Sequence, residues 1–205
     1  MIPARLPGTT RLVLVRHGAT ADAGAGVCYG SLDLELSAEG RAQADRAAEL
    51  LVNEELAAVY SSPRVRALET ARRLGREIAL REALCEIDFG QFEGRSYDEI
   101  ARDHPDLFAE WMAQPTRVRF PGGESYRDLR RRVLAEVGDL RVTHAGRAFC
   151  IVAHGGVCRA VLADALAMPD DAIFRLAQEH AGVSVIDWFA DGTPLVRVVN
   201  ALRSG

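Results

Sequence analysis

"RLVLVRHGAT", residues 11–20, combines the pattern of a buried strand with the residues of a functional site. Leu12 to Val15 form an apolar run with β-branched residues at alternate positions, which predicts a strand at about 11–16. Arg16 and His17 stand where that strand must end, because Gly18 follows. Ligands of open α/β sheets bind at the carboxyl ends of parallel strands, so we expect a site at this strand end.

A second strand of the same design lies at 148–153, where "AFCIVA" is followed by His154 and two glycines. If the two strands are neighbours, His17 and His154 face each other across one pocket. The alternative is that each histidine is satisfied separately by nearby backbone. Two His-Gly strand ends in one chain make that alternative the weaker one.

Strand-like and helix-like segments alternate along the remaining chain. Further strands are expected at 56–62 and in a hairpin at 183–200 around Asp191-Gly192. Helices are expected at 38–51 with Ser37 as N-cap, at 63–78 with Pro63 in the first turn, at 96–103, at 105–113, from "PGGES" (121–125) to about 143, and at 157–167. Residues 79–95 are expected to be irregular. The alternation predicts a single α/β domain of residues 1–205, with a mostly parallel central sheet, an antiparallel edge and helices on both faces.

Charge and hydropathy exclude several classes of protein. The net charge of the 205-residue chain is −4 at pH 7, which gives no reason to expect nucleic-acid binding. No apolar run approaches the roughly 20 residues of a membrane helix, and the initial "MIPARLPGTTR" lacks the apolar core of a secretory signal. The four cysteines include no CxxC pair and are expected to be reduced thiols. We therefore expect a cytoplasmic protein.

Cys150, His154 and Cys158 are evenly spaced, which raises the question of a metal site. Cys150 lies within the predicted strand at 148–153, and Cys158 lies within the helix that follows, so the three side chains need not converge. We expect no metal at these residues.

Two arginines lie in the first turn of the helix predicted after "SSP" (61–63). Arg64 and Arg66 are close to the positive end of the helix dipole, where cations are destabilising unless an anion lies above the helix start. Arg64 is equally well explained as a solvated surface residue, and we assign Arg66 to the site. The planar guanidinium binds phosphate oxygens through two hydrogen bonds.

Four side chains are thus expected to surround a phosphoryl group: Arg16, His17, Arg66 and His154. The backbone N–H groups of Gly155 and Gly156, at the start of a helix, would add an anion cradle. An acid for proton transfer is expected from "LCEIDFGQFEG" (84–94). The residues alone do not choose among Glu86, Asp88 and Glu93, all of which are also explained as solvated loop residues.

In these motifs the chain resembles the histidine phosphatase superfamily, also called phosphoglycerate mutase-like. The motifs are "RHGAT" (16–20), "SSPRVRALETA" (61–71), "EIDFGQFEG" (86–94) and "VAHGGV" (152–157), in the order found in that family. The resemblance implies the three-layer sandwich of the family and a phosphoric monoester hydrolase. It also implies a phosphohistidine intermediate and no cofactor.

The resemblance further implies a role for each site residue. His17 would accept the phosphoryl group, with its other ring nitrogen held by a backbone carbonyl. Glu86 would protonate the leaving alkoxide and then deprotonate the hydrolytic water. Arg16, Arg66 and a cationic His154 would stabilise the equatorial oxygens. The implied substrate-binding set is Arg16, Arg66, His154, Gly155 and Thr20.

The chain departs from the family pattern after the first motif. Many relatives continue with Glu-Thr and have an Asn a few residues later, whereas this chain has Ala19, Thr20 and Ala23. We therefore expect no Asn at this position to bind phosphate. Phosphoglycerate mutases tend to have extra segments between the acidic motif and the second histidine, so the shorter chain favours a phosphatase.

"GVCYGSLDLELS" (26–37) and "FPGGES" (120–125) resemble segments of bacterial α-ribazole-5′-phosphate phosphatases, which act late in cobalamin biosynthesis. This implies α-ribazole-5′-phosphate as the substrate, with the "CYG" and "PGGES" segments as walls above the phosphate. The alternatives are a broad-specificity or sugar-phosphate phosphatase, a phosphohistidine protein phosphatase, a phosphoglycerate mutase, or an inactive module that binds a phospho-ligand. The expected partner is a small-molecule phosphomonoester, and a homodimer is left open.

Overall fold

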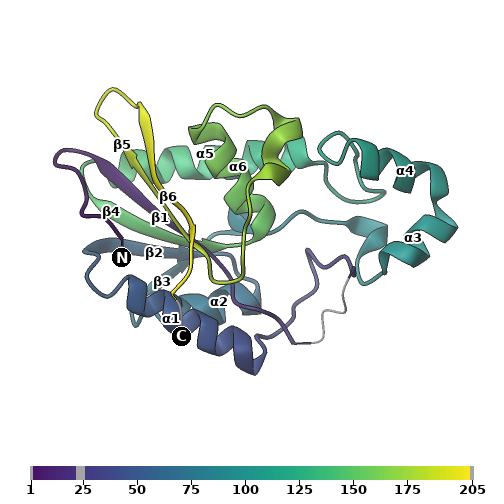
Figure 1. Ribbon diagram of the computed structural model, residues 1–205, viewed down its shortest axis with the longest axis horizontal. Coiled ribbons are helices and arrows are strands. Elements are labelled where there is room, and N and C mark those ends of the chain that lie inside the picture. The colour runs from purple at the N-terminus through teal and green to yellow at the C-terminus, as the bar shows by residue number, and fades with distance from the viewer. Residues whose placement is uncertain (1, 22–25, 204–205) are drawn as a thin grey trace.

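The computed structural model describes residues 2–21 and 26–203, and within them six strands form one sheet in the order β3-β2-β4-β1-β5-β6 (Figure 1). The strands are β1 (Thr10–Arg16), β2 (Leu56–Ser61), β3 (Ile78–Leu80), β4 (Ala148–Ala153), β5 (Val183–Trp188) and β6 (Pro194–Ala201). The first four in the sheet order run parallel, β5 is antiparallel to β1, and β6 is antiparallel to β5. The predicted mostly parallel sheet with an antiparallel edge is confirmed.

Helices cover both faces of the sheet, which confirms the predicted three-layer arrangement (Figure 1). One face is covered by α1 (Ala38–Leu50) and α2 (Val65–Arg72), and the other by α5 (Tyr126–Thr143) and α6 (Gly155–Ala165). Two short helices, α3 (Tyr97–Asp103) and α4 (Pro105–Ala113), lie beyond one end of the sheet. Within the described residues, no helix combines the length and the apolar composition that crossing a membrane requires.

The apolar run of β1 is buried on both sides, as the absence of polar alternation predicts. Leu12 and Leu14 pack with residues of α5 and α6, whereas Val13 and Val15 pack with residues of α1 and α2. All four side chains are at most 2 % exposed. The strand that ends in Arg16 is therefore held rigidly between two layers of helices.

The chain connections place a crevice at the carboxyl ends of β1 and β4. These two strands are parallel neighbours, with Arg16 opposite Ala153. After β1 the chain passes through α1 to β2 on one side of the pair, and after β4 it passes through α6 to β5 on the other side. Such a reversal of direction opens a crevice outside the strand ends. His17 and His154, the next residues of the two strands, lie there, as the sequence predicts.

The structure differs from the sequence expectation after β2. The helix predicted at 63–78 begins at Val65 and ends at Arg72, because Gly75 follows in the left-handed region at φ +62°. The chain then forms β3, which pairs with β2 and was expected to be helix and irregular chain. A three-residue edge strand carries too little alternation to be recognised from sequence.

A separate apolar cluster supports the chain around α3 and α4. Its buried members are Cys28, Phe92, Ile100, Trp111, Val118 and Phe120. Two 3₁₀ turns lie in the segment that was expected to be irregular, η1 (Glu82–Leu84) and η2 (Gly90–Phe92). This cluster holds the acidic segment beside the crevice.

Candidate active site

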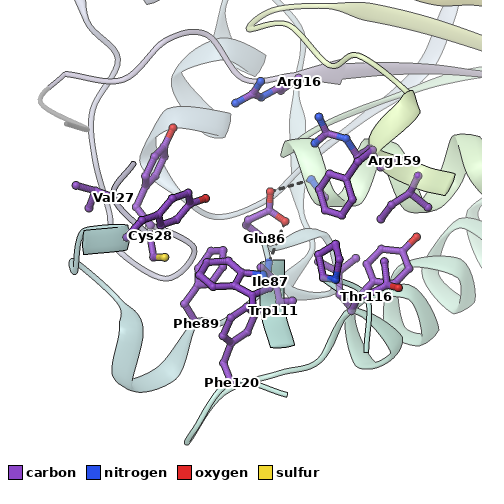
Figure 2. Close-up of a pocket in the computed structure, with 18 of the residues that line it drawn as sticks. Arg16, Val27, Cys28, Glu86, Ile87, Phe89, Trp111, Thr116, Phe120 and Arg159 are labelled. Atoms are coloured by element: carbon purple, nitrogen blue, oxygen red, sulfur yellow. Dashed lines mark hydrogen bonds between the residues drawn. The ribbon is translucent and has the colours of Figure 1, made fainter. Parts of the chain in front are cut away.

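A cavity of about 260 Å³ opens at the carboxyl ends of β1 and β4 (Figure 2). Its lining includes four ionisable residues selected from the sequence: Arg16, His17, Arg66 and Glu86. Arg16 and His17 come from the end of β1, Arg66 from the first turn of α2, and Glu86 from the loop after η1. Residues from three distant parts of the chain thus meet in one cavity.

His17 is held as a neutral imidazole. Its side chain is buried, and Nδ1 lies 2.7 Å from the carbonyl oxygen of Gly18. Because a carbonyl oxygen can only accept, Nδ1 carries the hydrogen, and the lone pair of the neutral ring lies on Nε2. Burial, followed by the charges of Arg66 and Arg16, holds the pKa of His17 well below its ordinary value. His17 therefore has the protonation state of a nucleophile.

His154 lies beside His17, with the ring centroids 5.1 Å apart, and it is fully buried. Its Nδ1 accepts a hydrogen bond from Nε of Arg66 at 3.3 Å, since arginine can only donate. Its Nε2 then carries the hydrogen and donates to Oγ of Ser62 at 2.9 Å. Burial, followed by His17 and Arg66, lowers the pKa of His154 well below its ordinary value. The expectation of a cationic His154 is wrong, because a ring that accepts from Arg66 is neutral.

Arg66 is completely buried and is held on three sides. Besides the bond to His154, Nη1 donates to the carbonyl of Leu32 at 2.6 Å and Nη2 donates to the carbonyl of Gly30 at 2.8 Å. Burial lowers the pKa of Arg66 from its ordinary value. Each Nη carries a second hydrogen, so the fixed guanidinium still has donors for an anion.

Arg16 is anchored by the segment that precedes β5. Nη1 donates to the carbonyl of Gln178, and Nη2 lies 3.0 Å from Nε2 of His180, which must accept. Burial, and then Arg16, lower the pKa of His180 to about 4, so His180 is neutral near pH 7. Among the described residues, Nε of Arg16 is buried without a hydrogen-bond partner. An anionic ligand would satisfy this donor.

Glu86 is held by two backbone N–H groups, one in the first turn of α6 and one from the residue that follows it in its own loop (Figure 2). Oε2 accepts from the N–H of Gly156 and Oε1 from the N–H of Ile87, both at 2.9 Å. The N–H of Gly156 therefore binds a carboxylate of the protein itself, and not a phosphate as the sequence led us to expect. Each carboxylate oxygen keeps a further lone pair, so the group can still carry and transfer a proton.

The structure distinguishes the three carboxylates that the sequence left open. Asp88 accepts from the N–H of Gly90 at 2.8 Å and thereby fixes a turn. Glu93 accepts from the backbone N–H groups of Gly30, Ser31 and Phe89. Of the three, Glu86 lines the cavity, while the other two hold loops together.

The "PGGES" segment (121–125) lies behind the acidic loop and not in the cavity wall. A Cβ on Gly123 would stand 2.3 Å from the carbonyl oxygen of Asp88, so the two backbones are in direct contact. The flanking Phe120 and Tyr126 line the cavity instead. The glycines serve to bring the two loops close together.

Four further residues named from the sequence lie outside the cavity lining or the described chain. His154 is one of them, since it contacts His17 and Arg66 and is not itself a lining residue. Thr20 forms an isolated backbone bridge with Leu36 and is not a lining residue. Gly155 adjoins the side chains of Arg16 and Arg159, and its neighbour Gly156 is the one that lines the cavity. Ala23 lies outside the described residues.

Cys150 and Cys158 lie on opposite faces of the sheet. Cys150 packs in the cluster below α1 and α2, and Cys158 packs in the cluster below α5 and α6. The two thiols and His154 therefore do not form one site. Across residues 2–21 and 26–203, no group of three His, Cys, Asp or Glu residues is arranged to hold a metal ion.

Sequence reasoning missed a third guanidinium and most of an aromatic wall, of which it expected only the "CYG" segment; Cys28 and Tyr29 of that segment line the cavity. Arg159, from α6, also lines the cavity. Seven aromatic side chains do so as well: Tyr29, Phe89, Tyr97, Trp111, Phe120, Tyr126 and Phe174. They come from segments spread between residues 29 and 174, and the sequence around each of them is typical of an aromatic residue that packs in an apolar core. Their meeting depends on tertiary structure, and no local pattern signals it.

Residues 12–201 match the model of a protein family described as "Histidine phosphatase superfamily (branch 1)". A bifunctional protein of Mycobacterium tuberculosis is 35% identical over 196 residues, which are 93% of this chain and 54% of that protein. The chain thus spans about half the length of this relative. Phosphoserine phosphatase 1 of Hydrogenobacter thermophilus is 32% identical over 180 residues, 86% of this chain and 85% of that enzyme.

Among solved structures, the α-ribazole phosphatase from Shigella flexneri superposes with a TM-score of 0.85 at 26% identity, covering 95% of this chain and 98% of that one.

Proposed function

The chain belongs to the histidine phosphatase superfamily, and we propose that it is a phosphomonoesterase that acts through a phosphohistidine on His17. The observation that carries this proposal is the neutral His17 ring, fixed through Nδ1 by the Gly18 carbonyl and placed in one cavity with the guanidiniums of Arg16 and Arg66 and with Glu86. The named phosphatases among its relatives support it.

In the proposed first step, Nε2 of His17 attacks phosphorus and the bond to the ester oxygen breaks. Glu86 gives its proton to the departing alkoxide. The imidazole becomes positively charged as the N–P bond forms, and the Nδ1–H bond to Gly18 is then strengthened. Arg16 and Arg66 bind the phosphoryl oxygens, whose charge they stabilise.

In the second step, water attacks phosphorus, the N–P bond breaks, and Glu86 takes the proton from the water. Inorganic phosphate then leaves and His17 returns to its neutral form. His154 does not act as a cation in this scheme. It positions Arg66 through the bond from Nε, and it lies against the nucleophilic ring.

For the substrate, we propose α-ribazole-5′-phosphate. The aromatic wall supports a leaving group with a flat ring system, because stacked and edge-on aromatic contacts favour such groups. The similarity to an α-ribazole phosphatase structure also supports it. Phosphoserine is the second candidate, since a relative carries that name, although an amino acid would leave most of the aromatic wall without a contact.

The substrate proposal is tested by measuring kcat/KM for α-ribazole-5′-phosphate, phosphoserine, 3-phosphoglycerate and sugar phosphates. Binding energy from the ring system should be expressed in the transition state, so the ribazole ester should react fastest by a wide margin. Mutase activity should be negligible, because water accepts the phosphoryl group. If phosphoserine or a sugar phosphate matches the ribazole ester, the substrate proposal fails and the phosphatase proposal stands.

A further inference from the structure

Arg159 is a cavity residue that the proposed reaction has not yet used. It lies in the second turn of α6, on the same helix whose first turn holds Glu86 (Figure 2). Its Nε donates to the carbonyl of Leu176 at 3.2 Å, and its guanidinium lies over the ring of Phe174, 5.4 Å from the centroid. These two contacts hold the base of the guanidinium and leave its Nη groups beside the cavity.

The guanidiniums of Arg159 and Arg16 converge over Gly155. A Cβ on Gly155 would stand 3.1 Å from Nη1 of Arg159 and 3.5 Å from Nε of Arg16. The Nε of Arg16 is the buried donor that has no partner within the described chain. An oxygen atom placed between the two side chains would accept from both of them.

This convergence is unfavourable without an anion. In the described residues neither guanidinium forms an ion pair with a carboxylate. Burial, followed by the charge of Arg16, lowers the pKa of Arg159. Two like charges brought together in a partly buried cavity repel each other. A negatively charged phosphate oxygen between the two guanidiniums would attract both of them and so offset that repulsion.

We propose that Arg159 is a third phosphoryl-binding residue, which binds an oxygen of the transferred group together with Nε of Arg16 in the space over Gly155. The inference rests on the proposed phosphatase function. It gives Gly155 a role as the residue whose missing side chain leaves room for that oxygen. It places three guanidiniums around a group that carries up to two negative charges.

Inorganic phosphate is the probe that distinguishes binding of the phosphoryl group from binding of the leaving group. It has the phosphoryl oxygens but no leaving group, so a loss of phosphate affinity can come only from the phosphoryl site. Phosphate binding is measured by calorimetry on the whole protein, and as inhibition of p-nitrophenyl phosphate hydrolysis. Loss of a charged hydrogen bond should weaken phosphate binding by about 10- to 100-fold in Arg159→Met. Arg159→Lys keeps the charge but not the planar guanidinium, so its phosphate affinity should lie between that of the unchanged protein and that of Arg159→Met.

Two further variants control the experiment. Arg175→Met removes one positive charge from an exposed residue of the neighbouring turn η3 (Asp170–Arg175) and should bind phosphate as the unchanged protein does. Gly155→Ala keeps every guanidinium but fills the space between them, and it should also weaken phosphate binding. Thermal melts show whether each variant is folded.

Unchanged phosphate binding in a folded Arg159→Met would overturn the proposal, and a raised KM for organic substrates alone would assign Arg159 to the leaving group. The calorimetric result does not depend on turnover. A protein that binds phosphate through Arg159 but hydrolyses no ester would therefore contradict the proposed function and leave this inference standing.

Discussion

Gly156→Ala tests whether the position of Glu86 matters for proton transfer. The backbone of Gly156 is helical and not in the left-handed region, so alanine imposes no backbone strain there. Its Cβ, however, would stand 2.3 Å from Oε1 of Glu86. The carboxylate must move by about 1 Å to reach van der Waals distance, and it then loses the 2.9 Å bond from the Gly156 N–H.

A displacement of about 1 Å costs on the order of 10²-fold in a step that depends on the displaced group. The affected step is protonation of the leaving oxygen. We therefore expect kcat for an alkyl phosphate to fall by roughly 10²-fold, within the 10²–10⁴-fold that general acids contribute. The rate for p-nitrophenyl phosphate should fall much less, because p-nitrophenolate leaves without a proton.

The assay compares the two steady-state rates in Gly156→Ala, the unchanged protein and Gly138→Ala. The Gly138 control lies within α5 with no atom within 4 Å of the added Cβ, so it should change neither rate. Equal losses on both substrates in Gly156→Ala, or no loss on either, would refute the assignment of Glu86 as the acid.

Four other outcomes are expected. His17→Ala should abolish the acid-labile, base-stable label that a phosphorylated substrate leaves on the protein, and a persistent label would place the nucleophile elsewhere. Glu86→Gln should slow alkyl phosphate hydrolysis by about 10²–10⁴-fold while sparing more of the p-nitrophenyl phosphate rate. Activity should survive EDTA and be inhibited by vanadate; loss on chelation with rescue by a divalent ion would contradict the guanidinium-based mechanism. Burial holds the pKa values of His17, His154 and His180 below the ordinary histidine value in the folded protein, so the unfolded chain binds more protons and the free energy of unfolding should fall as the pH drops below about 6.5. Denaturant melts at pH 7.5 and 5.5 measure this fall, and it should be smaller in His17→Asn; an equal fall in that variant would contradict the neutral state of buried His17.

The sheet could be predicted from sequence where the signal is local and strong. The run before Arg16 and the run before His154 are apolar on both faces, and each ends in a histidine followed by glycine, so their pairing follows from one rule about strand ends. Ser37 accepts from the N–H of Gly40 as an N-cap should. The end of α2 could not be predicted, because the helical spacing of apolar residues continues beyond Gly75, whereas the helix itself ends at Arg72 and Gly75 is in the left-handed region.

The sequence could predict which residues belong to the site, but not the contacts and charges that decide their roles. The choice of Glu86 over Asp88 depends on which carboxylate meets the N–H of Gly156, a contact between residues 70 positions apart. The charge of His154 depends on the direction of its bond with Arg66, which a sequence does not contain. Arg159 gave no signal, since an arginine within a helix is ordinary until the fold turns it toward the cavity.

The proposed reaction places two opposing requirements on the residues around the phosphoryl group, and the neutral state of His17 and His154 allows both to be met. Attack on phosphorus requires an uncharged His17, while binding the phosphoryl group requires nearby positive charge. A cationic His154, 5.1 Å away by ring centroid, would lose its charge over the same pH range in which His17 becomes reactive. Guanidiniums keep their charge throughout that range. Assigning the charge to Arg16 and Arg66, with His154 as the neutral acceptor that orients Arg66, lets binding stay constant while the nucleophile remains unprotonated.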